Sequence, residues 1–120
     1  MNNILIQKLK NFPQQIQNQE MQVLDCYNQK QAAKSDLDNY LLGIDDRIAQ
    51  NPEYKNDLQR KAARHNLISQ SDIYHELNQK LLGWETNYKI AQIDLDKIKR
   101  EYSVAKLEIK IAIADLTPTG

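Results

Sequence analysis

Histidines paired with carboxylates could bind a metal, and the chain has two histidines, His65 and His75. Asp72 precedes His75 by three positions, a spacing that places a carboxylate and an imidazole on one face of a helix. Helical metal sites need two such motifs and further inward-facing carboxylates. The sequence has no second motif, so we expect His75 to face solvent, and we predict neither a metal nor a cofactor.

Neighbouring carboxylates could serve acid–base chemistry, and two pairs are present, Asp45-Asp46 and Asp94-Leu-Asp96. On a helix, residues one or two positions apart point in different directions, so neither pair converges on one point. The sequence also lacks a Gly-rich phosphate loop, Cys-x-x-Cys, His-Glu-x-x-His and Gly-x-Ser-x-Gly. We therefore expect a protein without catalytic residues, one that is not an enzyme.

A basic cluster lies in the middle of the chain and consists of Lys55, Arg60, Lys61, Arg64 and His65. Because Arg60/Arg64 and Lys61/His65 are four residues apart, they share adjacent strips of one helix face. This cluster could contact phosphates or an acidic partner, although we favour a solvated face. Four or five cations support only weak, salt-sensitive nucleic-acid binding, which is the alternative function.

The composition indicates which elements position these residues. The 120 residues are 41% apolar and 27% charged with a net charge of zero, which is typical of a folded domain or a coiled coil. Three glycines and three prolines are too few for the turns of a β-sandwich, a barrel or an α/β fold. No signal peptide or membrane span is expected, and the single cysteine, Cys26, excludes an internal disulfide. We predict a cytoplasmic protein with no membrane contact.

The C-terminal half carries an uninterrupted coiled-coil pattern. Apolar residues recur at alternating steps of three and four, which is typical of a helix packed along one seam. These seam residues are Tyr74, Leu77, Leu81, Trp84, Tyr88, Ala91, Leu95, Ile98, Tyr102, Ala105, Ile109, Ala112 and Leu116. Large side chains alternate with small ones, which favours close antiparallel packing. We predict a helix over about 72–115, with Ser71 and Asp72 able to cap its start and with Pro118 and Gly120 closing its end.

The N-terminal half repeats the pattern less regularly, with polar interruptions at Gln19 and Lys30. We expect Pro13 to lie in the first turn of a helix over about 14–49. Asn51 and Pro52 then predict the cap and first position of a short helix over about 52–67. The whole chain, 1–120, is predicted to be a single all-α domain, a long antiparallel helical hairpin with a short helix at its tip.

A second apolar set lies off the seam and near the open end of the hairpin. A helix that is apolar on two faces must be covered on two sides, which a two-helix hairpin cannot do. We therefore predict self-association, most economically as a homodimer forming a helical bundle, with a heteromeric partner helix as the alternative. The predicted self-association residues are Leu9, Phe12, Ile90, Ile93, Val104, Leu107, Ile111 and Ile113.

Two Leu-Leu-Gly segments place glycine inside predicted helices, where it costs about 1 kcal/mol relative to alanine. If the hairpin is centred near residue 63, Gly43 and Gly83 face each other. We predict that they make room for Trp84, so that Gly83→Leu would overpack the helix pair. The expected role of Gly43, Gly83 and Trp84 is therefore helix packing.

Three segments resemble small all-helical accessory proteins of prophages and phage-like regions. They are Asn56-Asp-Leu-Gln-Arg-Lys-Ala-Ala-Arg64, Asp72-Ile-Tyr-His-Glu-Leu77 and Lys99-Arg-Glu-Tyr-Ser-Val-Ala-Lys-Leu107. The resemblance covers residues 56–107. It implies an accessory protein working beside DNA recombination or replication factors, and it carries over no catalytic residues.

Overall fold

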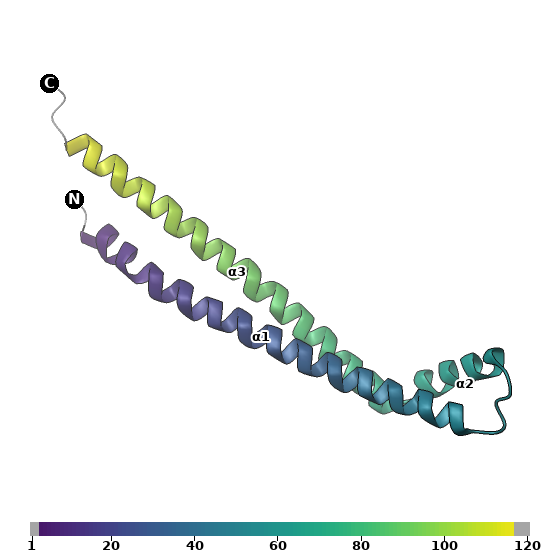
Figure 1. The fold of residues 1–120 in the computed structure, drawn as a ribbon. Helices are drawn as coiled ribbons and strands as arrows, with labels where there is room; N and C mark the ends of the chain where they lie inside the picture. The colour runs from purple at the N-terminus through teal and green to yellow at the C-terminus, as the bar shows by residue number, and fades with distance from the viewer. Residues whose placement is uncertain (1–2, 117–120) are drawn as a thin grey trace. The chain divides into compact units, whose positions relative to one another are not determined.

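The computed structural model describes residues 3–116, and helices make up almost all of them. The helices are α1 (Asn3–Gln50), α2 (Asp57–Ser69) and α3 (Asp72–Leu116), and this part of the chain contains no strand. Figure 1 shows α1 and α3 as unbroken helices with α2 between them along the chain. The predicted fold class, an all-α antiparallel helical hairpin with a short tip helix, is confirmed. Pro118 and Gly120, expected to close the last helix, lie outside the described residues.

The chain divides into two compact units, where the sequence predicted one domain. Unit 1 comprises Met1–Cys26 with Tyr88–Gly120, and unit 2 comprises Tyr27–Asn87. No linker separates the units, because α1 and α3 each run through both. Because the same seam pattern runs through the whole of each long helix, the amino-acid composition does not change where the two units meet. The sequence therefore did not reveal the boundary between them.

Unit 1 is held together by the first half of α1 and the second half of α3. Phe12 is 2% exposed and meets the Tyr102 ring edge-on, with centroids 5.4 Å apart. Ala91 and Ala105 are buried, so small residues do lie at the contact with α1 as the seam pattern predicted. The Gln19 side-chain amide donates a 3.0 Å hydrogen bond to the Ala91 carbonyl oxygen. This polar interruption of α1 therefore contacts the facing helix.

The seam prediction for α3 is confirmed along nearly its whole length. Every seam residue from Tyr74 to Ala112 is buried or half-buried, and Trp84 is among the half-buried ones. Leu116, the last residue of the pattern, is exposed at the end of the helix. The three–four spacing therefore identified the packed face of α3 correctly.

The predicted start of α1 is wrong by about eleven residues, because the helix begins at Asn3 and contains Pro13 in its interior. Proline removes one backbone hydrogen bond and usually costs about 3 kcal/mol inside a helix. Pro13 is exposed, however, and the residues before it carry apolar side chains that pack on α3, Phe12 above all. This burial keeps the segment before Pro13 helical.

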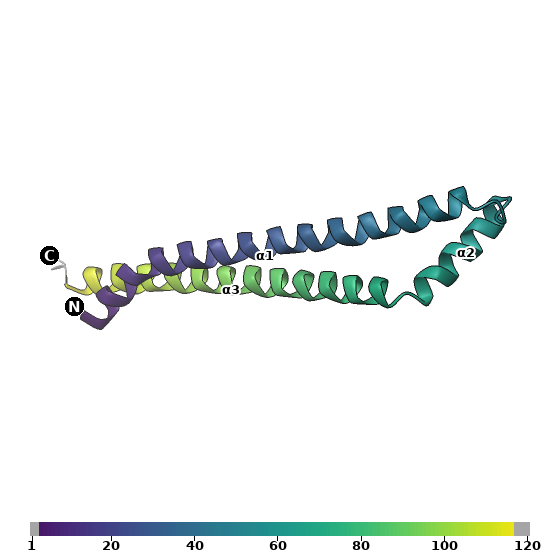
Figure 2. The same ribbon diagram turned by 90° about the horizontal axis from the view of Figure 1, so that it is seen from below.

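Unit 2 has its own small core where the last turns of α1 meet α2. Ile44, Ile48 and Ala63 are buried, and they are surrounded by Tyr40, Tyr54, Leu67 and Ile68. The Tyr40 hydroxyl also shares a hydrogen bond with the Ser71 hydroxyl. In Figure 2, α2 leads from the loop after α1 to the start of α3.

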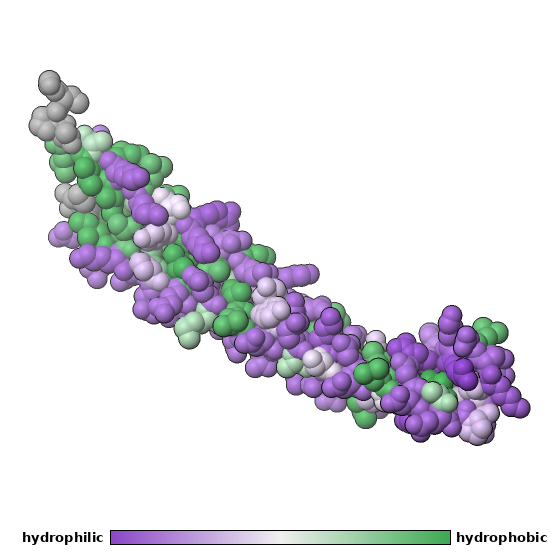
Figure 3. Space-filling view, in the orientation of Figure 1, coloured by the Kyte–Doolittle hydropathy of each residue, from purple (hydrophilic) through white to green (hydrophobic). Residues whose placement is uncertain are grey.

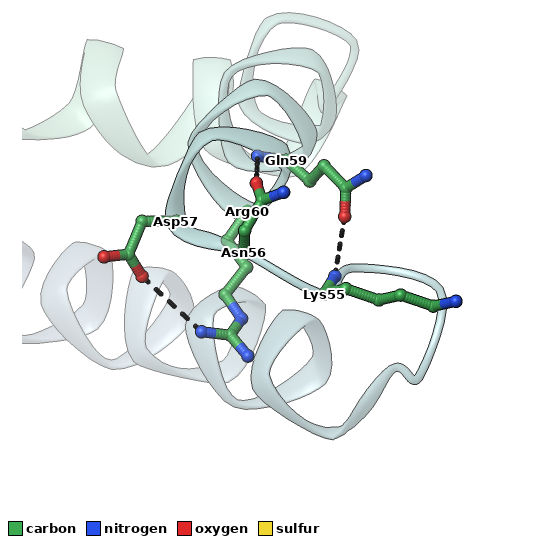
Figure 4. A network of polar contacts seen from close by, with 5 residues as sticks. All are labelled: Lys55, Asn56, Asp57, Gln59 and Arg60. Atoms are coloured by element: carbon green, nitrogen blue, oxygen red, sulfur yellow. Dashed lines mark hydrogen bonds and ion pairs between the residues drawn. The ribbon is translucent and has the colours of Figure 1, made fainter.

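The predicted boundaries of the short helix are also wrong, since α2 spans Asp57–Ser69 and not 52–67. The Asn51 side chain accepts a 2.9 Å hydrogen bond from the Glu53 N–H, which forms a turn and not a helix cap. Asn56 is the cap, accepting from the Gln59 N–H at 2.9 Å, and Gln59 accepts in return from the Lys55 N–H at 2.7 Å (Figure 4). Two asparagines suited to capping compete here, and only the second begins the helix.

We expect Asn56→Ala to lower the free energy of unfolding by about 1 kcal/mol, because it leaves the Gln59 N–H without its side-chain acceptor. Urea denaturation followed by circular dichroism measures this change. Asn66→Ala is the matched control, since Asn66 lies exposed within the same helix and alanine favours helix there. Equal effects from both substitutions would contradict the capping role.

The predicted pairing of the two glycines is wrong. A hairpin centred near residue 63 would place Tyr40 near residue 86, whereas Tyr40 meets Ser71. Gly43 and Gly83 are both exposed, and a Cβ added at either one has no neighbouring atom within 4 Å. The physical reason is that α2 packs on the last turns of α1 and so takes the place expected for the early part of α3. The glycines therefore do not make room for Trp84.

Candidate interaction surfaces

Carboxylates neutralise part of the basic cluster at the tip. Arg64 Nε lies 2.8 Å from Asp45 Oδ1, which ties α2 to α1, and Arg60 lies 3.5 Å from Asp57 within α2. Lys55, in the loop before α2, points away from Arg60 in Figure 4. The two arginines with the best helical spacing are thus occupied by acidic partners.

The remaining members of the cluster, Lys61 and His65, are exposed on α2. Beside α2 lies a shallow groove lined by Tyr54, Gln59, Ala62, Asn66 and neighbouring residues, with no lysine or arginine in its lining. The predicted contact residues are therefore brought near one another, but they do not form a concave positive surface. The surface ion pairs of Arg64 with Asp45 and of Arg60 with Asp57 contribute about 0.2–1 kcal/mol each, so they stabilise the tip only weakly.

His75 is exposed, as predicted. Its Nε2 lies 3.1 Å from the Ser69 carbonyl oxygen, and its ring meets the Tyr74 ring edge-on. Over residues 3–116, no group of three or more His, Cys, Asp or Glu side chains is placed to hold a metal ion. Cys26 is buried and has the Gln22 amide 3.8 Å from its Sγ.

An apolar stripe on α3 is exposed in unit 1. At 3.6 residues per turn, positions 104, 107 and 111 fall on the side of α3 opposite to Tyr102 and Ala105, which pack toward α1. We define the outer stripe as Ile90, Ile93, Lys97, Arg100, Val104, Leu107, Ile111 and Ala114, which again alternate in steps of three and four.

The apolar side chains of the outer stripe are solvent-exposed. Ile90, Ile93, Val104, Leu107 and Ile111 are each 51–62% exposed, and Ile113 beside them is 49% exposed. In Figure 3, hydrophobic residues gather over the ends of α1 and α3 next to the termini, whereas α2 is mainly hydrophilic. Isolated exposed leucines are ordinary, but a row of apolar residues at coiled-coil spacing, interrupted only by Lys97 and Arg100, indicates an interaction surface.

Two of the predicted self-association residues do not belong to this surface. Phe12 is buried against Tyr102, and Leu9, three positions earlier on the same face of α1, is half-buried. The sequence places both at the open end because they are apolar and close to the N-terminus. Their burial in the core of unit 1 removes them from the candidate interface.

Tertiary contacts create pairings that the sequence did not reveal. Asp45 and Arg64 are nineteen positions apart, and Tyr40 and Ser71 are thirty-one apart, so no helical spacing relates either pair. Gln19 stands out in the sequence only as a polar interruption. A polar side chain within an apolar seam is the one signal that could have pointed to its cross-helix hydrogen bond.

None of the three helices, over the residues the structure describes, combines the length and apolarity needed to cross a bilayer. Comparisons of the chain with protein-family models, curated proteins and solved structures found no match. The similarity of residues 56–107 to prophage accessory proteins therefore stays a prediction.

Proposed function

We propose that this chain is a non-enzymatic coiled-coil interaction protein that self-associates, two copies pairing through the outer stripe of α3. The observation that carries the proposal is a helix packed on α1 along one face while a second row of large apolar residues is exposed on the other. Covering the exposed half of each of these side chains gains about 1 kcal/mol. The self-association residues are Ile90, Ile93, Val104, Leu107, Ile111 and Ile113.

Several expectations from the sequence accompany this proposal. The outer stripe offers apolar side chains for contact with another helix, as expected for a binding or scaffold protein. A single free cysteine suits a reducing compartment, so we place the protein in the cytoplasm. The resemblance of residues 56–107 would make it an accessory protein of a prophage.

Nucleic-acid binding by the basic cluster is the weaker candidate function. Its two arginines already pair with Asp45 and Asp57, which leaves Lys55, Lys61 and His65 to contact phosphates. So few unpaired cations support weak binding that decreases steeply with salt.

Size-exclusion chromatography with light scattering tests the self-association directly. We expect a dimer at tens of micromolar for the wild-type chain and a monomer for Leu107→Gln combined with Ile111→Gln, because both substitutions place amides in the apolar interface. The matched control is Met21→Gln with Leu24→Gln on α1. Leu24 is 58% exposed and Leu107 is 57% exposed, so the two pairs lose comparable apolar surface.

The control pair is expected to remain dimeric. A monomeric wild-type chain would contradict the proposed self-association. So would a Leu107/Ile111 variant that keeps its helix content and still dimerises as tightly as the wild type.

A further inference from the structure

We infer that the two copies pair in parallel and in register along the outer stripe. The inference rests on the proposed self-association and specifies the orientation of the partner. The occupant of the stripe is a second copy of α3 running in the same direction, so that each stripe residue lies beside the same residue of the other chain. The charges that flank the stripe in unit 1 distinguish this orientation from the antiparallel one.

The two flanks of the outer stripe differ in charge, and all their residues are exposed. One flank is wholly acidic and consists of Asp94, Glu101, Glu108 and Asp115. The other flank is mixed, with a lysine near each end, and consists of Lys89, Asp96, Ser103 and Lys110. Residues at these flanking positions of a coiled coil set the orientation of the partner helix.

Symmetry decides which flanks meet. In an antiparallel pair the two-fold axis is perpendicular to the helices, so each flank faces the same flank of the other copy. Wherever the two helices overlap, the acidic flank would then face the acidic flank of the other copy, whichever heptad register they adopted. Like charges placed together across an interface disfavour that arrangement. The antiparallel orientation is therefore the unfavourable one.

In a parallel pair the two-fold axis runs along the helices, so each flank faces the opposite flank of the other copy. A residue of the mixed flank then lies beside the acidic residue five positions later in the second copy. This brings Lys89 to Asp94 of the second copy and Lys110 to Asp115 of the second copy. Each contact occurs twice by symmetry, at both ends of the stripe.

The charges at the centre of the stripe balance in the parallel pair, although they do not by themselves select that orientation. Lys97 and Arg100 interrupt its apolar row, and the parallel pairing places Asp96 beside Glu101 of the second copy at that level. In each copy, these two cations and two anions give the central layer no net charge. Long basic side chains can keep their stems on the apolar surface while their charged ends reach those carboxylates.

The same two cations fix the register. Sliding one copy by seven residues would place Lys97 against Val104 and Arg100 against Leu107 of the other chain. In register, each cation lies beside the like cation of the second copy, but the Asp96 and Glu101 carboxylates are within reach to balance their charge. The shifted pair leaves each cation against an aliphatic side chain, where desolvating it is costly, so the in-register arrangement is favoured. A polar residue at a core position specifies coiled-coil register in this way.

Single-cysteine cross-linking tests the orientation. In a Cys26→Ala background, Ile93→Cys and Ala114→Cys are made as two separate variants and oxidised mildly. A parallel, in-register dimer brings each new thiol beside its own copy, so both variants are expected to form disulfide-linked dimers. An antiparallel pair can bring at most one of these two positions together with itself. Light scattering on the reduced proteins reports dimerisation independently.

The outcomes separate this inference from the proposed function. Reduced variants that are dimeric, with only one or neither of them cross-linking, overturn the parallel register and leave self-association standing. A wild-type chain that is monomeric overturns both.

Charge reversal provides a second test that needs no new cysteine. Lys110→Glu is expected to raise the dimer dissociation constant about tenfold, and adding Asp115→Lys is expected to restore it, because the parallel pairing places these residues together. Sedimentation equilibrium measures both constants. In an antiparallel pair the second substitution does not compensate for the first, so a weakening without rescue contradicts the inference, as does the absence of any weakening.

Discussion

Phe12→Ala is expected to lower the free energy of unfolding by about 3–5 kcal/mol, more than any other single substitution proposed for this chain. Phe12 is 2% exposed and meets Tyr102 edge-on in unit 1. Removing its ring leaves a cavity beside Tyr102, between α1 and α3. The substitution also removes the burial of Phe12 that keeps the turns before Pro13 helical.

Urea denaturation at one fixed protein concentration measures this loss, because dimerisation would make the apparent stability depend on concentration. Phe12→Leu keeps much of the apolar volume and is expected to cost less. Leu24→Ala is the control for a large apolar residue that α1 exposes to solvent. If Phe12→Ala cost no more than Leu24→Ala, Phe12 would not be the core residue that its burial indicates.

Replacing both exposed glycines with alanine is expected to raise the free energy of unfolding by about 2 kcal/mol. Glycine in a helix interior costs about 1 kcal/mol relative to alanine, chiefly through the freedom it has in the unfolded chain. A Cβ at Gly43 or Gly83 meets no atom within 4 Å, so no packing penalty opposes the gain. No atom lies close enough to Gly83 to clash with the Cβ of a leucine, which contradicts the close glycine contact expected from the sequence.

Thermal and urea denaturation of Gly43→Ala with Gly83→Ala measure this effect. Ala32→Gly is the matched control, because Ala32 is exposed within α1 and the reverse change is expected to destabilise by about 1 kcal/mol. A double alanine variant less stable than the wild type would show that the glycines serve a close contact after all.

The amino-acid sequence by itself determined which face of each long helix is packed. Three–four spacing is a local property of a helix, since it follows from 3.6 residues per turn and needs no knowledge of the partner. The packed face of α3 was therefore predictable, and so was the exposed row that includes Ile93 and Leu107. Ser71 was likewise predictable as a cap, and its hydroxyl accepts from the Tyr74 N–H.

The sequence assigned the apolar residues of the first turns less well. Leu9 and Phe12 have the residue types of an interface and also those of a core, and their spacing fits either role. Only the position of α3 beside them decides between the two. For the same reason the sequence predicts a helix start near Pro13, where local propensity opposes a helix that burial of Phe12 favours.

Only the tertiary structure decided which turns of α1 and α3 face each other and how the loop after Gln50 and α2 are arranged at the tip. A heptad pattern looks the same after a shift of seven residues, so it cannot say which turn of α1 faces which turn of α3. The loop after Gln50, the choice of Asn56 over Asn51 as the cap and the docking of Ala63 on Ile44 and Ile48 fix that register. The contact of Ala63 with Ile44 and Ile48 joins two different helices, and its free energy depends on shape, which the spacing of residues does not encode.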